Sequence, residues 1–290
     1  MQLDAHQPEN FSYAAPDDPC LKRLLIRAIE RMTGQPYLKH LYETNRKAPL
    51  PGENFWEMAV RLLELKVDYN QEALFAVPRE GPLVIVANHP FGVLDGIVIS
   101  YLASKMRDDF RVLTNSVLYR AEEIRPFLLP VDFSETKEAM AVNIRTRAEA
   151  RAFLKNGGCV VVFPAGGAST APKPWSRKAI DAEWGNFTAG LITQTKASVL
   201  PVYFAGQNSR LFQVASHISL TLRLSLFFKE VYDKIGSRMR VRIGRVISYP
   251  ELERLDRKEF MRHLRDITYS LATLTPDPPR GFWRKIGARG

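Results

Sequence analysis

The sequence predicts an α/β fold with a mostly parallel central sheet flanked by helices, preceded by an N-terminal amphipathic helical segment. From about residue 73, short apolar runs rich in β-branched residues alternate with longer helical patterns. Strands that are apolar on both faces are typical of a parallel sheet covered by helices on both sides. Strands are expected at 83–87, 111–114, 128–131, 159–163, 199–204 and 240–243. Helices are expected at 96–105, 137–155, 183–196, 217–235 and 252–274.

The chain is expected to have four parts. Residues 1–17 are polar and contain proline, which indicates a flexible arm. Residues 18–68 are expected to form an N-terminal helical segment that docks on a membrane, and 69–275 the α/β domain. Residues 276–290 form a basic tail with aromatic side chains, a composition suited either to a disordered end or to the headgroup layer of a bilayer.

The N-terminal segment begins with a helix signal. Asp18 is a suitable cap, Pro19 suits the first helical position, and Gly34 is a plausible stop. One face carries Leu21, Leu24, Leu25, Ala28, Ile29 and Met32; the other side carries Lys22, Arg23, Arg27 and Arg31. This pattern fits either an ordinary surface helix packed on a core or a helix lying in an acidic headgroup layer. A second helix is expected at about 53–65, after the breaks at Pro49 and Pro51.

The composition restricts the partners. The net charge of +10, from 41 Lys and Arg against 31 Asp and Glu, favours an anionic partner. The basic residues are dispersed and no nucleic-acid motif is present, so we expect anionic lipid and no nucleic acid. No apolar stretch approaches the ~20 residues of a spanning helix, so membrane contact is expected to be peripheral, at the cytoplasmic face.

The first residues and the cysteines add two further expectations. The start, at 1–6, has neither the basic nor the apolar region of a signal peptide. Cys20 and Cys159 lie far apart at no metal-ligand spacing, which suits a reducing compartment. We expect no metal and no cofactor.

The candidate catalytic residues are His89 and Asp95. His89 directly follows the strand at 83–87, and the carboxyl ends of strands are where ligands bind in open α/β sheets. Asp95 is expected at the start of the next helix, so the turn should bring its carboxylate toward the imidazole. A carboxylate on one ring nitrogen leaves the other free to accept a proton, which makes a general base. Asn88 and Gly92 flank the pair as candidate substrate-binding residues.

Two further loops follow strands. The loop after 159–163 is rich in small residues, whose amides could hold a phosphate or an oxyanion or could simply form a turn. The strand at 199–204 ends in a polar cluster that could bind a headgroup or acyl carrier, or satisfy a turn. The candidate binding residues in these two regions are Pro164, Gly166, Gly167, Ser169, Pro201, Asn208, Ser209 and Arg210.

Taken in order, these loops resemble the glycerolipid, or lysophospholipid, acyltransferase family. The matching blocks are NHPFGVLD at Asn88–Asp95, FPAGGAS at Phe163–Ser169 and VLPVYFAG at Val199–Gly206, with a weaker block at Pro126–Asp132. The resemblance covers about residues 70–250. It implies that His89 takes the proton of a lysolipid hydroxyl, that Asp95 orients it, and that acyl-CoA or acyl carrier protein is the co-substrate. It also implies helices that dock on the bilayer before the α/β domain.

The chain departs from the family pattern in two places. Five residues, instead of four, separate His89 from Asp95, a spelling similar to that of a divergent, hemolysin-like branch. Ala165 and Ala168 stand where the family has Glu and Arg, in the block thought to hold the phosphate of lysophosphatidic acid. Losing a guanidinium removes charge-assisted bonds of about a few kcal/mol each. We therefore expect an acceptor other than lysophosphatidic acid, either another lysophospholipid or a lyso-aminolipid, such as one built on an amino acid.

The alternative function is a lipid or thioester hydrolase. In that reading Ser169 is the nucleophile, His89 the base and Asp95 the orienting acid. However, Ala171 stands where a nucleophile elbow of the Gly-x-Ser-x-Gly type has its second glycine. The sequence therefore favours direct transfer over hydrolysis.

Overall fold

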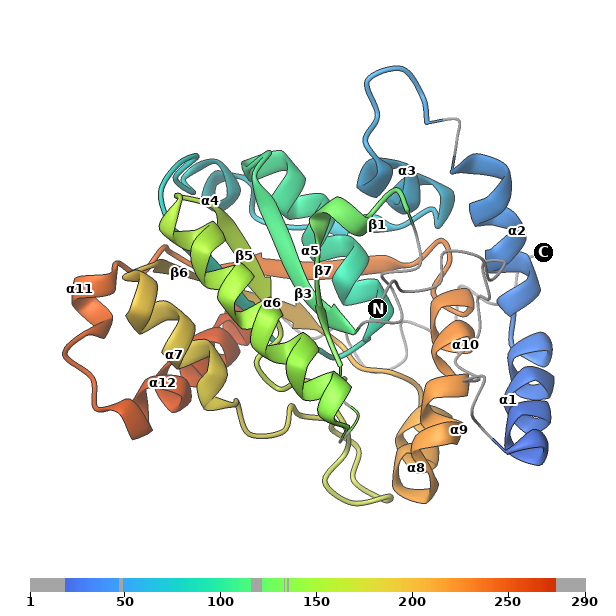
Figure 1. Cartoon of the computed structure of the whole chain (residues 1–290). Helices are drawn as coiled ribbons and strands as arrows, with labels where there is room; N and C mark the ends of the chain where they lie inside the picture. Colours follow the sequence, from blue (N-terminus) through green and yellow to red (C-terminus); the bar gives the residue numbers. More distant parts are fainter. Residues whose placement is uncertain (1–18, 47–48, 116–121, 133, 135, 275–290) are drawn as a thin grey trace.

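A seven-stranded sheet forms the centre of the computed structural model, which describes residues 19–46, 49–115, 122–132, 134 and 136–274 (Figure 1). The strand order is β1-β7-β6-β2-β5-β3-β4. The bounds are β1 Lys66–Asp68, β2 Leu83–Ala87, β3 Phe110–Asn115, β4 Leu128–Val131, β5 Cys159–Val162, β6 Ser198–Ala205 and β7 Arg238–Ile243. All pairings are parallel except that between β6 and β7. This arrangement confirms the predicted fold class.

Helices cover both faces of the sheet. In β2, Leu83, Ile85 and Ala87 belong to one core cluster, and Val84 and Val86 belong to the other. This alternation is what a strand buried on both faces requires. The first face is covered by α3 (Phe55–Leu62), α4 (Gln71–Phe75) and α5 (Val93–Met106). The second is covered by α6 (Lys137–Lys155), α7 (Asn186–Thr195) and α12 (Arg257–Ser270).

The N-terminal segment differs from the prediction in several details. Helix α1 spans Cys20–Met32, and Pro19 is its N-cap rather than its first helical residue. A further helix, α2 (Gln35–Asn45), was not predicted; Gly34, with a φ of +90°, turns the chain between the two helices. The second expected helix ends early, and the chain continues into β1 of the sheet. The predicted arm and tail, 1–17 and 276–290, lie outside the described residues.

The C-terminal third contains more breaks than predicted. The helix expected at 217–235 is three helices, α8 (Arg210–Ile218), α9 (Leu220–Ser225) and α10 (Phe227–Tyr232). Ser219 breaks it, because its extended backbone and its hydroxyl cap the start of α9. The helix expected at 252–274 is α11 (Tyr249–Leu252), α12 and a 3₁₀ turn (Leu271–Leu274). A second 3₁₀ turn, Arg125–Phe127, precedes β4.

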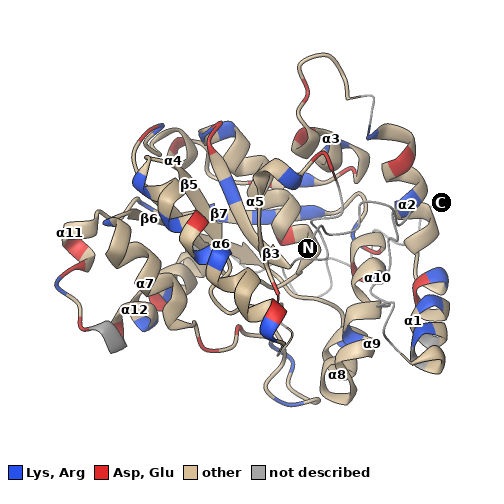
Figure 2. Cartoon of the chain, in the orientation of Figure 1, with Lys and Arg blue, Asp and Glu red and all other residues tan. Residues whose placement is uncertain are grey.

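Charged residues are spread over many elements of this fold, as Figure 2 shows. The basic residues include several on α1, which lies at the same end of the molecule as α8, α9 and α10 (Figure 2). Among the described helices, none is both long enough and apolar enough to cross a membrane.

Candidate active site

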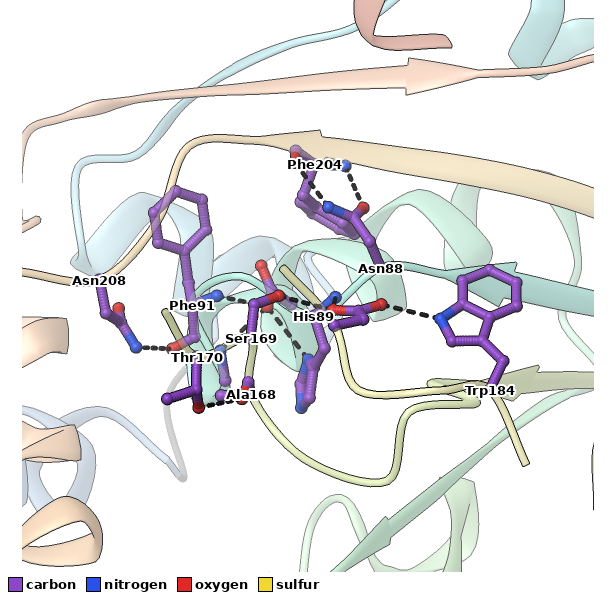
Figure 3. A network of polar contacts seen from close by, with 12 residues as sticks. Asn88, His89, Phe91, Ala168, Ser169, Thr170, Trp184, Phe204 and Asn208 are labelled. Carbon is purple, nitrogen blue, oxygen red and sulfur yellow. Dashed lines mark hydrogen bonds and ion pairs between the residues drawn. The ribbon is translucent and has the colours of Figure 1, made fainter. Parts of the chain in front are cut away.

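The candidate site begins where β2 ends. Asn88, the first residue after the strand, is buried, and its side chain bonds both backbone groups of Phe204 in β6 (Figure 3). Its Oδ1 accepts from the Phe204 amide at 2.7 Å, and its Nδ2 donates to the Phe204 carbonyl at 2.9 Å. Asn88 therefore holds the end of β2 against β6 and fixes the start of the turn that carries His89. These contacts lie within the fold, and the expected role of Asn88 in substrate binding stays a prediction.

His89 and Asp95 lie together, as the sequence predicts. Nδ1 of His89 is 3.0 Å from Oδ2 of the fully buried Asp95. The same oxygen accepts hydrogen bonds from the amides of Phe91, at 2.7 Å, and Gly92, at 2.9 Å. The His–Asp contact is close but is not a well-aligned hydrogen bond. Catalytic hydrogen bonds are often loose in the absence of substrate and tighten in the reacting complex.

Gly92 makes this turn possible. Its φ of +75° is one that side chains disfavour, and a Cβ there would lie 2.3 Å from the Phe227 ring. Helix α5 then begins at Val93, which places Asp95 in its first turn, three residues earlier than the predicted helix start at 96. Gly92 thus accommodates the extra residue between His89 and Asp95 and positions the acid, and its expected role in substrate binding stays a prediction.

The electrostatics of the pair depend on burial. Burial raises the pKa of the Asp95 carboxyl above its usual range, while the His89 imidazole and the two amides oppose that shift in pKa. The His89 ring stacks on Phe163 with centroids 3.9 Å apart and remains partly exposed, at 17%. With Nδ1 facing Asp95, Nε2 is the edge of the ring turned away from the acid. The arrangement can therefore take a proton from a bound hydroxyl.

The second loop, after β5, packs against the first. The amide of Ser169 donates to the His89 carbonyl at 2.7 Å, and that of Gly166 donates to the Phe163 carbonyl at 3.0 Å. These two amides are therefore occupied within the fold and do not face a ligand. The amides of Gly167 and Ala168 make no hydrogen bond to any described residue. Pro164 accepts from the Gly185 amide through its carbonyl, a contact within the fold.

A buried carboxylate that the sequence did not reveal joins the two loops. Asp181 accepts through Oδ1 from the Ser169 hydroxyl, at 2.5 Å, and from the His89 amide, at 3.1 Å. Its Oδ2 accepts from Nε1 of Trp184 at 2.9 Å (Figure 3). The bridge between Thr170 and Ile180 carries Asp181 to this position. No periodicity marks such a residue, because its partners lie in separate loops.

The environment of Ser169 argues against the hydrolase. The side chain is buried, and its hydroxyl is donated to Asp181 instead of to the His89 ring. A serine nucleophile needs its hydroxyl within reach of the base that deprotonates it. Ser169 therefore serves to join the loops in this structure.

The third cluster reaches the site through one residue. Asn208 is buried; its Nδ2 donates to the Phe91 carbonyl at 3.4 Å, and its Oδ1 has no partner among the described residues. Ser209 caps α8 and donates its hydroxyl to Glu230, while Arg210 donates to the carbonyls of Pro174 and Ser176. Pro201 lies inside the sheet, paired with Val86 of β2. Ser209, Arg210 and Pro201 are thus engaged in the fold.

An arginine distant in sequence contacts the second loop. Arg223 of α9 is half-buried, and its guanidinium donates to the Ala168 carbonyl at 2.5 Å. The same group lies 3.6 Å from where a Cβ of Gly167 would be. No carboxylate of a described residue forms an ion pair with it. The loop that lacks the family's arginine therefore has a guanidinium supplied by another element.

The site holds no cluster of metal ligands in the described part of the chain. There, no three His, Cys, Asp or Glu side chains are grouped so that they could hold an ion.

The fold and the site together define an α/β acyltransferase. The family model described as "Acyltransferase" matches residues 21–275, and the chain therefore belongs to this family, as the resemblance of its loops predicts. It is an enzyme that transfers acyl groups other than aminoacyl groups.

Two relatives and one solved structure are similar to the chain. Lyso-glycine lipid O-acyltransferases from Bacteroides thetaiotaomicron and Phocaeicola vulgatus are each 23% identical over 235 residues. These alignments cover 76% of this chain and 80% and 78% of the two relatives. The crystal structure of the 1-acyl-sn-glycerophosphate (LPA) acyltransferase PlsC from Thermotoga maritima has a TM-score of 0.51 at 16% identity. That match covers 89% of this chain and 98% of PlsC, and it shows a common fold.

Proposed function

We propose that the protein transfers a fatty acyl group from acyl-CoA or acyl carrier protein to the hydroxyl of a lysolipid, in membrane lipid synthesis. The observation that carries this proposal is the 3.0 Å contact between Nδ1 of His89 and buried Asp95 at the carboxyl end of β2. The names of both relatives, which acylate a lyso-glycine lipid, support the acceptor class.

The reaction follows from this geometry. Nε2 of His89 takes the proton of the acceptor hydroxyl as its oxygen attacks the thioester carbonyl, and Asp95 stabilises the imidazolium that forms. The carbon–sulfur bond then breaks, and the leaving thiolate takes the proton from the imidazolium. The amides of Gly167 and Ala168 are the candidates to stabilise the oxyanion, because those of Gly166 and Ser169 are occupied.

For the acceptor, we favour a lyso-aminolipid that carries an acidic group. An amino acid linked to a fatty acid through its amine keeps its carboxylate, which a guanidinium can bind. Arg223 lies against the second loop and pairs with no described carboxylate, so it is suited to this role. Ala165 and Ala168, which replace the family's Glu and Arg, argue against lysophosphatidic acid.

We further propose that the enzyme works as a peripheral protein on the cytoplasmic face of an anionic membrane. Helix α1 packs on the protein through Ile26 and Glu30, which are buried. Its residues Leu21, Leu24 and Met32, on the face that the periodicity marks as apolar, are exposed. An apolar helix face turned to solvent, with arginines beside it, fits the headgroup layer better than a protein core.

The test is the exchange of His89 for alanine. Without the base, transfer should fall by roughly 10²–10⁴-fold while the melting temperature is unchanged. His263→Ala is the matched control, because this histidine of α12 is exposed and no hydrogen bond or ion pair joins it to His89, Asp95 or Asp181 among the described residues. A folded His89→Ala enzyme with wild-type turnover of labelled acyl-CoA and acyl carrier protein across a lysolipid panel would overturn the mechanism.

A second exchange separates transfer from hydrolysis. Ser169→Ala removes the hydroxyl bond to Asp181 but keeps the backbone bond to His89. Direct transfer should therefore be weakened only modestly, whereas a serine hydrolase would lose its activity entirely. Complete loss of acyl transfer in a folded Ser169→Ala enzyme would favour the covalent route.

A further inference from the structure

Helix α8 exposes a stripe of apolar side chains on the surface of the described part of the chain. Leu211, Val214 and Ile218 lie at i, i+3 and i+7 and are all exposed, with Ile218 at 69%. Leu220, at the start of α9, continues the stripe. The opposite side of α8 is anchored in the protein by buried Phe212. The helix is therefore firmly attached, while its stripe leaves a large apolar surface open to solvent.

A loop with an exposed tryptophan is fastened beside this helix. Trp175 is 72% exposed and belongs to the loop between Ala171 and Ala179. Side chains around α8 bind the backbone of this loop along its length. Gln213 and His217 bind Ala171, Arg210 binds Pro174 and Ser176, and Gln207 binds Arg177 and Ala179. These bonds hold Trp175 in a fixed place next to the stripe.

The charge of the loop identifies the partner. Lys173, Arg177 and Lys178 are exposed around Trp175, and residues 172–178 contain no acidic side chain. Apolar side chains, a tryptophan and cations in one surface match the acyl boundary, the headgroup layer and the charge of an anionic bilayer. Surfaces that bind other proteins are depleted in lysine, so the lysines of this loop favour a membrane over a protein partner.

We propose that the α8 stripe and the Trp175 loop form a bilayer-docking surface separate from α1, which sets the enzyme on anionic lipid beside its acceptor site. Gln213 and Arg223 connect the helices of this surface to the loop at Ala168–Ala171, which also contacts His89. Docking would thus bring the membrane next to the proposed headgroup site. The inference rests on the proposed transfer to a lipid, but vesicle binding tests it independently of catalysis.

The experiment measures binding of the full chain to phosphatidylcholine vesicles with and without phosphatidylglycerol. Trp175→Ala and Ile218→Ser should each weaken binding to the anionic vesicles by about tenfold, since each removes an apolar side chain that the docked protein would bury in the bilayer. Lys173→Gln with Lys178→Gln should weaken it by about fivefold per charge, and only on anionic vesicles. All four residues are exposed, so the melting temperatures should match that of the wild type.

The matched control is Phe75→Ala. Phe75 is as exposed as Trp175 but lies on α4, at the opposite end of the molecule (Figure 1). Wild-type binding by the folded variants, or an equal loss in Phe75→Ala, would overturn the inference. Transfer to a detergent-dispersed acceptor should be unchanged in the variants that lose vesicle binding. If the wild type acylates no lysolipid, the proposed function fails. The vesicle comparison still shows whether the α8 stripe and the Trp175 loop bind anionic membranes.

Discussion

Asp95 is a fully buried carboxylate whose neighbours stabilise its charge only in part. Burial raises the pKa of this carboxyl, and the bonds from the Phe91 and Gly92 amides and the contact with His89 do not offset the shift. An acid whose pKa is higher in the folded than in the unfolded protein stabilises the fold when protonated. That stability is present at low pH and is lost as the pH rises through the folded-state pKa.

The exchange Asp95→Asn should therefore separate activity from stability. The variant should lose roughly 10²–10⁴-fold in kcat, because no charge remains to orient and stabilise the imidazolium. Its melting temperature should exceed that of the wild type at neutral pH, and the difference should shrink as the pH falls, when Asp95 becomes protonated. Calorimetry over a pH series measures this trend. If the difference in melting temperature instead grew toward low pH, the neighbouring groups, and not burial, would determine the pKa of the Asp95 carboxyl.

Arg223 allows a test of acceptor recognition at a single side chain. Arg223→Gln should raise KM for a lysolipid with a carboxylate by about tenfold or more while kcat changes little, because a charge-assisted bond is lost. Arg223→Lys should recover part of the loss, and a neutral lysolipid should be affected by neither exchange. Equal effects on acidic and neutral acceptors would mean that Arg223 only supports the Ala168 carbonyl.

At the scale of elements, the site is formed by loops that follow different strands and are joined by hydrogen bonds. The turn after β2, the loop after β5 and the segment leading to α7 meet at Asp181. Tyr269 of α12 accepts from the Asp181 amide at 3.0 Å, and the pKa of its phenol is raised to about 12 by burial and by the neighbouring Asp181 charge. The segment is thus held from both sides, and His89 is positioned through its backbone.

The exchange Asp181→Asn should weaken this junction. The side-chain amide of this variant would turn its own N–H toward either the Trp184 indole N–H or the His89 backbone N–H, leaving a buried donor without an acceptor, which costs about 1–3 kcal/mol. The free energy of unfolding should fall by that amount and kcat should fall with it. Asp233→Asn, an exchange in an exposed ion pair, is the control, with an expected change near zero. An unchanged kcat would show that the junction does not position His89.

Elements formed by local patterns could be predicted, and those set by distant partners could not. The strand at 83–87 and the helix at 137–155 were predicted to the residue, because their apolar spacing records burial directly. The helix expected at 217–235 was wrong because Ser219 prefers a cap to a helix interior. The site was predictable at His89 and Asp95, six residues apart. Asp181 and Arg223 were missed because bridges and tertiary packing bring them there.

At the scale of the whole molecule, the sheet end that holds the site and the exposed apolar surfaces are connected. Helix α1 contacts α9, α9 contacts α8, and Arg223 and Gln213 contact the loop behind His89. Ile29 of α1 packs on the small cluster that contains Phe212 and Ala168. The proposed membrane surfaces and the proposed headgroup site are therefore parts of one packed unit at one end of the molecule (Figure 1).

This organisation predicts two separable contributions to membrane binding. With a net charge of +10, binding to anionic vesicles should weaken several-fold when salt rises from about 0.1 M to about 1 M, as the screening length falls from ~10 Å to ~3 Å. Binding that persists at high salt should come from insertion of apolar side chains into the bilayer.

The double exchange Leu21→Ser with Leu24→Ser removes exposed apolar surface of α1. It should reduce the salt-resistant binding by about tenfold per residue and leave the salt dependence unchanged. Co-sedimentation across a salt series measures both terms, with Met140→Ser on α6 as an equally exposed control. Binding that does not change with salt would show that charge does not attract the protein to the membrane. An unchanged salt-resistant part in the double variant would show that α1 does not insert.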